Sequence, residues 1–328
     1  MAITLVTGVT GFVGRRVLRR MFDGDDEIRV LVRDPARLAP GDAERVQVVR
    51  GDLSDRWAVA RAVERADTVL HLAALARPHA RHPGTFAAVN AAAVHELLRA
   101  AAEAGVRRFV HVSTWLVAPP DRPAPVRGAA ARLTPYETSK QQAEMSVLAQ
   151  AATGLDAVIV RPTRVYGPGP LNAANGATRL LALYLSGRLR LRLDDGGALA
   201  NWVHVDDVAD GILLAARRGG RGTAYVLGGP ENVPLTAYLE LAAEIAGVPR
   251  RRMLALPPAA GVALARLTVL LGGLGDLPAL SPGWIRTFLE SRTADIAPAR
   301  RDLGYAPRTL REGLTETVAW LDGGGREW

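Results

Sequence analysis

A tyrosine and a lysine stand four residues apart in the stretch Tyr136-Glu137-Thr138-Ser139-Lys140, a spacing that puts both on one face of a helix. A free phenol has a pKa of about 10, and a nearby ammonium group stabilises the phenolate and lowers that pKa. The chain has 41 lysine and arginine residues, and Lys140 is the one lysine among them. An ammonium is not interchangeable with a planar guanidinium, so its retention here predicts a proton-exchanging pair.

Two hydroxyl groups, those of Ser113 and Thr114, follow a predicted apolar strand over residues 109–113. A hydroxyl in this position can hydrogen-bond a substrate carbonyl or alkoxide beside the phenol. A helix-capping or turn-forming role is the alternative. Trp115 comes next, and it either walls the substrate pocket or packs in the core.

Three glycines, Gly8, Gly11 and Gly14, occupy a predicted turn between a strand over residues 3–6 and a helix over residues 15–21. In such a turn the first glycine permits a tight bend, the second lets the backbone approach a pyrophosphate, and the third lets the helix pack close to the strand. The amides and dipole at the helix start then face the phosphates. The sequence therefore predicts a dinucleotide site.

Arg33 follows the second predicted strand, about twenty residues after the last glycine of the turn. An acidic residue in this place binds the ribose 2′-hydroxyl of NAD, whereas an arginine suits the additional phosphate of NADP. Asp34 comes directly after it, and a solvated arginine is the alternative. We expect NADP(H) rather than NAD(H). Asp52, after the third strand, is placed to reach the adenine edge or to cap the next helix.

Apolar strands alternate with helices through the first half of the chain, which predicts βαβ units and an α/β fold with a doubly wound parallel (Rossmann) sheet. The rhythm changes where prolines and glycines follow residue 162. We expect a dinucleotide-binding domain over residues 1–165 and a smaller C-terminal substrate-binding lobe over 166–328, with about 205–228 returning to the first domain. The expected helices include 57–65, 87–104, 139–152, 178–186 and 208–217. Ligands should bind at the carboxyl ends of the strands.

Composition excludes several function classes. The chain of 328 residues has no cysteine, which excludes disulfides, thiolate metal sites and cysteine nucleophiles. Its six histidines show no paired spacing beside carboxylates, so no metal site is expected. The net charge of +8 is spread over many helix faces without interleaved aromatic residues, which disfavours nucleic-acid binding. The most apolar run, 259–274, contains Arg266 and several glycines, so we expect no membrane span and a cytoplasmic protein.

The order of glycine turn, Ser-Thr pair and Tyr-Lys pair resembles the short-chain dehydrogenase/reductase superfamily. The TGxxGxxG spacing over 7–14, His71 to Ala74, the stretch 161–168 and the stretch 202–208 resemble its extended branch, with a subfamily likeness to 3β-hydroxysteroid dehydrogenases and dihydroflavonol reductases. The likeness covers nearly the whole chain and is looser after residue 228. It implies that the catalytic residues are Tyr136, Lys140, Thr114 and Ser113.

The resemblance also implies a binding site for the cofactor and the substrate. Asn90 resembles an asparagine that supports the lysine through water, although helix packing is an equal alternative. The cofactor contacts that the resemblance and the motifs predict are Gly8, Thr10, Gly11, Phe12, Val13, Gly14, Arg33, Asp52, Leu53, Ala73, Ala74, Asn90, Tyr136, Lys140, Pro162 and Thr163. The predicted substrate contacts are Trp115, Arg164 and Tyr166.

The predicted function is an NADP-dependent reductase or dehydrogenase that interconverts a ketone and a secondary alcohol. A nucleotide-sugar epimerase with tightly held NAD is the alternative, and Arg188, Arg190 and Arg192 on one strand face would suit its substrate. A cofactor-sensing binding protein is a third possibility, against which the intact Tyr-Lys pair argues. The small substrate is expected to be hydrophobic. Helices 91–104 and 139–152 have small apolar faces, which the superfamily resemblance assigns to a homodimer interface; packing in the core is the alternative.

Overall fold

The computed structural model describes residues 1–77, 82, 84–122, 124, 134–193, 196–271 and 282–324. Its centre is a parallel sheet of seven strands in the order β10-β6-β5-β4-β1-β2-β3. On one side of β1 the sheet continues with β2 and β3, and on the other side with β4, β5, β6 and β10. The sheet is therefore doubly wound outward from β1. The α/β Rossmann fold predicted from the sequence is thereby confirmed.

The large sheet consists of β1 (Ile3–Thr7), β2 (Glu27–Val32), β3 (Gln47–Arg50), β4 (Thr68–His71), β5 (Arg108–Val112), β6 (Ala157–Pro162) and β10 (Ala224–Leu227). The smaller sheets consist of β7 (Arg164–Tyr166), β9 (Leu199–His204) and β11 (Asn232–Pro234), and of β8 (Leu191–Leu193) and β12 (Leu254–Leu256). The helices are α1 (Phe12–Met21), α2 (Arg56–Val63), α3 (Gly84–Ala87), α4 (Ala93–Glu103), α5 (Pro135–Ala152), α6 (Gly176–Leu185), α7 (Val205–Arg218), α8 (Leu235–Ile245), α9 (Pro258–Leu270), α10 (Pro282–Leu289) and α11 (Leu310–Asp322).

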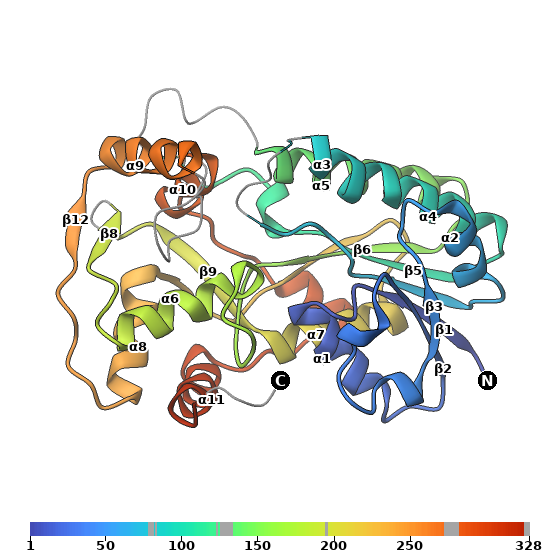
Figure 1. Ribbon diagram of the computed structural model, residues 1–328, viewed down its shortest axis with the longest axis horizontal. Helices are drawn as coiled ribbons and strands as arrows, with labels where there is room; N and C mark the ends of the chain where they lie inside the picture. The colour runs from blue at the N-terminus through green and yellow to red at the C-terminus, as the bar shows by residue number, and fades with distance from the viewer. Residues whose placement is uncertain are drawn as a thin grey trace.

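Helices cover both faces of the large sheet (Figure 1). Helices α1 and α7 pack on one face, where Val17 and Ile212 share a core with strand residues such as Val30. Helices α2, α4 and α5 pack on the other face around Leu97 and Phe109. Burial on both faces explains why the strands read as continuous apolar runs rather than as alternating ones.

Helix α5 begins earlier than the sequence analysis expected, at Pro135 rather than Ser139. Thr134 caps it, since its hydroxyl accepts the backbone N–H of Glu137 while the Glu137 carboxylate accepts the N–H of Thr134. Proline is favoured in the first helical position. Tyr136 and Lys140 therefore both lie in the first two turns. The expected helix 87–104 is also modified: a wider turn at Ala88–Ala92 joins α3 to α4.

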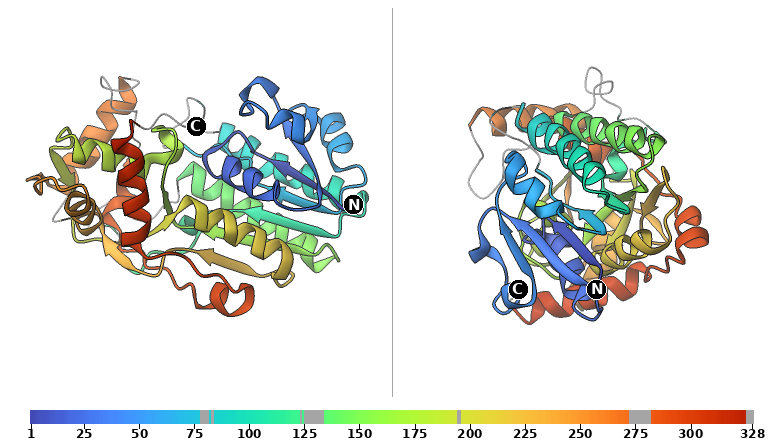
Figure 2. Two further views of the ribbon diagram at one scale, coloured as in Figure 1. Left: turned by 90° about the horizontal axis from the view of Figure 1, so that it is seen from below. Right: turned by 90° about the vertical axis from the view of Figure 1, so that its right-hand side faces the viewer.

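A smaller lobe lies beside the large sheet along the long axis of the molecule (Figure 2). Its core packs α6, α8 and α11 around β9, with Tyr238 and Trp202 stacked at 4.1 Å between ring centroids. The chain returns to the nucleotide side twice after leaving it: β10 pairs with β6, and Leu303 and Tyr305 enter the core beneath α7. The second of these returns has no counterpart in the sequence analysis.

None of the described helices is long and apolar enough to cross a membrane. The apolar run 259–274 supplies α9, which ends at Leu270, and residues 272–274 lie outside the described part of the chain.

Candidate active site

A cavity of about 410 Å³ opens where the strands of the large sheet end and the smaller lobe begins. The glycine turn after β1 forms one wall, the Ser-Thr pair after β5 and the Tyr-Lys pair of α5 form another, and α6 and α10 contribute the rest. This position at the carboxyl ends of the strands is the one expected for a ligand in an open α/β sheet.

The cavity brings together most of the residues singled out from the sequence. Those that line it are Gly8, Gly11, Phe12, Val13, Gly14, Ala74, Ser113, Thr114, Trp115, Tyr136, Lys140, Pro162, Thr163 and Arg164. Those that do not line it are Thr10, Arg33, Asp52, Leu53, Ala73, Asn90 and Tyr166.

The glycine turn has the geometry of a backbone cradle. Gly8 has a φ of +78°, and a Cβ atom there would lie 2.5 Å from the backbone nitrogen of Ala73. A Cβ on Gly14 would lie 2.1 Å from the carbonyl oxygen of Gly8, so α1 packs directly on the turn. No side chain caps the start of α1 at Gly11, and no acidic residue stands in its first turn. These amides and the helix dipole fit the pyrophosphate of a dinucleotide.

The side chains of Tyr136 and Thr114 both line the cavity, and the Thr114 hydroxyl lies near enough to the phenol to lower its pKa. The hydroxyl of Thr114 also accepts the backbone N–H of Leu116 at 3.3 Å, which fixes the short turn after β5. The buried hydroxyl of neighbouring Ser113 has no hydrogen-bond partner within the described part of the chain. Ser113, Thr114 and Tyr136 thus all contribute to the wall of one cavity.

Lys140 is 2% exposed and donates a hydrogen bond of 2.6 Å from its Nζ to the carbonyl oxygen of Val112. Burial lowers the pKa of Lys140 to about 8, against the attraction of Glu144. Burial likewise raises the pKa of Tyr136 to about 12, partly offset by the hydrogen bond from Thr114. Burial therefore dominates the pKa of the phenol, and the lowering of that pKa by Lys140 stays a prediction.

Arg33 and Asp52 meet at the ends of β2 and β3, 3.8 Å apart, with 74% and 47% of their side chains exposed. The carboxylate of Asp52 also accepts the backbone N–H and hydroxyl of Ser54. Asp55, not Asp52, caps α2, since its carboxylate accepts the N–H groups of Trp57 and Ala58.

Two predicted site residues have other contacts. Asn90 is 1% exposed, and its amide bonds the backbone of Leu75 and the hydroxyl of Ser139, which ties the segment after β4 to α5. Tyr166 is 1% exposed and packs edge-on to Tyr238 in the core of the smaller lobe. It belongs to that core and does not line the cavity, so its contact with a substrate stays a prediction.

Several lining residues were not singled out from the sequence. Leu180 and Leu183 of α6, Trp202 of β9, and Thr287 and Phe288 of α10 add a mostly apolar wall. Arg164 lines the same cavity, with its guanidinium 4.5 Å from the centroid of the Phe288 ring. Trp202 begins the family-like stretch 202–208, whereas α6 and α10 show only a helical apolar pattern, which core residues share.

The basic triplet considered for a sugar nucleotide does not line the cavity. Arg188 and Arg190 precede β8, and of the three only Arg192 lies in that strand. The expectation of one basic strand face is therefore wrong.

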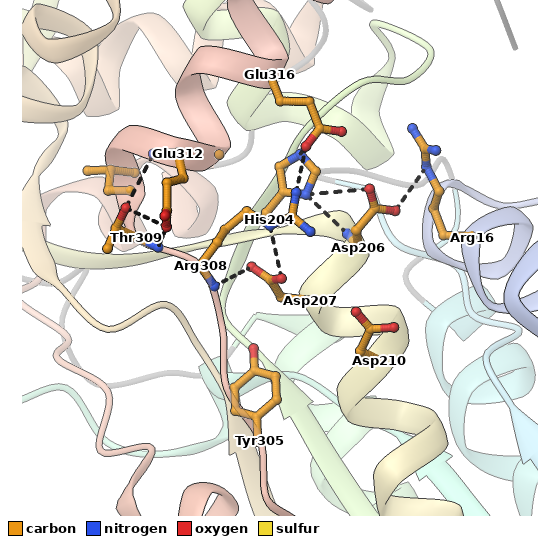
Figure 3. Close-up of polar contacts among 12 residues, drawn as sticks. Arg16, His204, Asp206, Asp207, Asp210, Tyr305, Arg308, Thr309, Glu312 and Glu316 are labelled. Atoms are coloured by element: carbon orange, nitrogen blue, oxygen red, sulfur yellow. Dashed lines mark hydrogen bonds and ion pairs between the residues drawn. The ribbon is translucent and has the colours of Figure 1, made fainter.

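An ionic cluster joins α1, α7 and α11 away from the cavity lining (Figure 3). Arg16 and Arg20 pair with Asp206, and Arg308 pairs with Asp207 and Glu316. His204, Asp206 and Glu316 lie close enough to share a metal ion. The arginines already neutralise these carboxylates, and burial lowers the pKa of His204 to about 3. The cluster therefore connects the N-terminal domain to the last helix.

Comparison with known proteins agrees with this geometry. The model of the NAD-dependent epimerase/dehydratase family matches residues 4–228. Sterol demethylase protein B of Methylococcus capsulatus is 30% identical over 97% of this chain and 98% of its own. The 4-hydroxy-2-methyl-3-oxo-4-farnesyl-3,4-dihydroquinoline-1-oxide ketoreductase of Stigmatella aurantiaca is 32% identical over 95% of this chain and 94% of its own.

Among solved structures, MoeE5 in complex with UDP-glucuronic acid and NAD is 28% identical, with a TM-score of 0.76 over 98% of this chain and 100% of that one. The glycine turn and the Tyr-Lys pair both lie within residues 4–228, which the family model matches. The chain belongs to the NAD-dependent epimerase/dehydratase family, within the extended short-chain dehydrogenases/reductases.

Proposed function

We propose that this protein is an NADP-dependent oxidoreductase that interconverts a hydrophobic ketone and its secondary alcohol. The observation that carries the proposal is that Tyr136, Thr114 and Lys140 come together in the wall of one mostly apolar cavity. A phenol and a hydroxyl in this arrangement suit one oxygen atom of a bound molecule.

In the proposed reaction the substrate oxygen is held by Thr114 and the unpartnered hydroxyl of Ser113. Tyr136 gives a proton to that oxygen during reduction and takes it back during oxidation. Lys140 brings a positive charge to the same wall, which favours a phenolate over a phenol. A nicotinamide dinucleotide, when bound, supplies or accepts the hydride at the neighbouring carbon.

The glycine turn, Pro162 and Thr163 would hold this cofactor. Arg33 supports NADP over NAD, because it is exposed at the end of β2 where the ribose phosphate would lie. The family is described as NAD-dependent, and MoeE5 carries NAD. The choice of NADP therefore rests on Arg33.

The substrate class rests on the side chains opposite the catalytic pair. Leu180, Leu183, Trp202 and Phe288 present apolar surface, while Arg164 and Arg179 supply guanidinium groups. Apolar walls with few placed polar groups are typical of sites for hydrophobic ligands. The similarity to a ketoreductase and to a sterol demethylase protein supports the same class.

A nucleotide-sugar epimerase is the second candidate, favoured by the family description and by the likeness to MoeE5, which holds a sugar nucleotide. Arg179 in the cavity wall would suit a diphosphate. Such an enzyme would keep its NAD and show no net cofactor turnover.

A cytoplasmic homodimer is part of the proposal. Met145 and Leu148 of α5 are 66% and 43% exposed, on a helix that packs beside α4. Exposed apolar side chains on one helix suit a helical interface between two copies.

The deciding experiment titrates the purified protein with NADPH and NADH and then follows NADPH oxidation with a panel of polycyclic and long-chain ketones. We expect exchangeable NADPH, turnover of an apolar ketone, and a loss of at least about 10²-fold in kcat for Tyr136→Phe with unchanged NADPH affinity. NAD that survives purification without exchange would instead favour the epimerase. Near-normal turnover by Tyr136→Phe would refute the assigned chemistry.

A further inference from the structure

A buried ionic cluster lies next to the catalytic pair and belongs to neither the cofactor site nor the cavity lining. It consists of Glu137 on α5, Arg286 on α10, and Glu290 and Arg292 in the segment that follows α10. Their side chains are between 0% and 4% exposed. Two positive and two negative charges are present, so the cluster is neutral as a whole.

Glu137 connects this cluster to the catalytic tyrosine. It follows Tyr136 directly, and its carboxylate accepts the N–H of Thr134 that begins α5. The same carboxylate accepts hydrogen bonds of 2.9 and 2.7 Å from Arg286. The start of the tyrosine helix is therefore fixed by a guanidinium from α10, two residues before Phe288 in the cavity wall.

Arg292 connects the cluster to the threonine. It donates to Glu290 at 3.0 Å and also to the carbonyl oxygen of Ala118, and its guanidinium lies 5.8 Å from the centroid of the Trp115 ring. Trp115 donates from its indole nitrogen to the carbonyl oxygen of Thr293 at 3.1 Å. The cluster that holds the start of α5 through Arg286 therefore also holds, through Arg292, the short segment that begins at Thr114.

We propose that Glu137, Arg286, Glu290 and Arg292 are positioning residues that hold Tyr136 and Thr114 in place relative to each other from the smaller lobe. Removing one partner of such a cluster leaves an uncompensated buried charge, which is far more disruptive than removing a surface ion pair. The inference rests on the proposed function for its kinetic readouts, and a second readout is independent of it.

The charges of the cluster also bear on the acidity of Tyr136. Beyond the dominant effect of burial, Glu137 raises the pKa of Tyr136, and Arg286 offsets that charge. The Thr114 hydroxyl lowers the pKa of the phenol, and Lys140 lines the same cavity from α5; both residues remain in every variant below. Arg286→Met should therefore raise the pKa of the phenol, and Glu137→Gln should lower it.

The activity test measures kcat, KM and the pH dependence of alcohol oxidation with the apolar probe substrate that the ketone panel identifies. We expect Arg286→Met and Glu137→Gln each to lower kcat at least about tenfold while NADPH affinity stays within about twofold. The acid limb of the pH profile should move to higher pH in Arg286→Met and to lower pH in Glu137→Gln, by on the order of one pH unit. Arg286→Lys should recover part of the rate.

The function-independent test measures hydrogen–deuterium exchange by mass spectrometry. In Arg286→Met, protection should fall in two separate segments, 114–118 and 134–140. The matched control is Arg308→Met, which breaks the half-buried pair with Asp207 outside the cavity. It should lower stability without changing exchange in either segment or moving the pH profile.

The proposal would be overturned if the acid limbs of the two pH profiles stayed in place or moved in the same direction. Unchanged hydrogen–deuterium exchange in segments 114–118 and 134–140 of Arg286→Met would also overturn it. If no ketone or alcohol is turned over but both segments lose protection, the proposed function fails and the positioning role stands.

Discussion

Arg161 holds the carboxylate of Glu144 by two hydrogen bonds, of 2.9 and 2.6 Å, one helical turn beyond Lys140 on α5. The Glu144 side chain is 6% exposed. Burial lowers the pKa of Lys140, and the negative charge of Glu144 opposes that fall. Strand β6, which carries Arg161, therefore helps to set the charge of Lys140.

Because Lys140 is the one lysine of the chain, its ionisation can be followed directly by NMR of protein labelled with [ε-¹³C]lysine. The single side-chain signal should titrate near pH 8 in the parent protein. Glu144→Gln should move its midpoint to lower pH, because the attraction to the carboxylate is gone and Arg161 is left unpaired. Glu103→Gln, at an exposed pair with Arg99 on α4, should leave the midpoint unchanged. A parent midpoint near 10 would contradict the burial effect.

Gly14→Ala should abolish the fit of α1 onto the glycine turn. The added Cβ would lie 2.1 Å from the carbonyl oxygen of Gly8, so backbone atoms must move. Such overpacking costs about 1–3 kcal/mol of stability. We expect a lower midpoint of thermal unfolding and at least about a tenfold loss of NADPH affinity by fluorescence titration. Gly84→Ala, at a helix start with nothing within 4 Å, serves as the control and should bind like the parent.

Arg33→Ala tests the cofactor preference. Loss of a charge-assisted contact to a ribose phosphate should weaken NADPH binding roughly tenfold, while NADH binding changes less than about twofold. Arg107→Ala is matched in exposure at 74% and pairs with Asp67 at the opposite end of the strands. It should affect neither cofactor. Equal losses for NADPH and NADH would remove the argument for NADP.

Two buried histidines should make the protein sensitive to mild acid. His71 and His111 stack at 5.5 Å between ring centroids on β4 and β5, and both are 0% exposed. Burial, assisted by the charge of Lys140, lowers the pKa of His71 to about 3 and that of His111 well below its ordinary value. Below about pH 6.5 the unfolded chain binds protons that the folded protein does not, so stability is lost as pH falls.

His71 should cost on the order of 2 kcal/mol of unfolding free energy between pH 6.5 and pH 5, and His111 should add a loss in the same direction, both measured by urea denaturation at each pH. His111→Gln should reduce the dependence by its share. His95→Gln, at an exposed position on α4, should not change it. A stability that is flat from pH 7.5 to pH 5 in the parent protein would contradict the burial of neutral rings.

The parts of the site that the sequence predicted are those set by local spacing. Gly8, Gly11 and Gly14 form the turn and Tyr136 and Lys140 share a helix face, because bends and helices bring residues a few positions apart together. Thr134, Pro135 and Glu137 carried a helix-start signal that would have corrected the onset of α5.

What the sequence left out depends on packing between distant segments. Trp202 reaches the cavity because β9 pairs with β7, and α10, which carries Phe288, is bonded to α5 through Arg286 and Glu137. A local apolar pattern does not distinguish a cavity wall from a core. Tyr166 shows the reverse case. Its place in a family-like stretch indicated the cavity, yet the side chain fills the core beside Tyr238. The buried partnership of Arg286 with Glu137 spans 149 positions and had no sequence signature.

The path of the chain has a consequence for engineering. The polypeptide leaves the nucleotide side at β7, returns for α7 and β10, leaves again at β11, and returns once more around Leu303 before α11. A transplanted lobe from a relative would have to join its host at every one of these crossings. Substrate specificity is therefore more readily changed by substituting single residues of the cavity lining, such as Trp202 or Phe288, than by exchanging the whole smaller lobe.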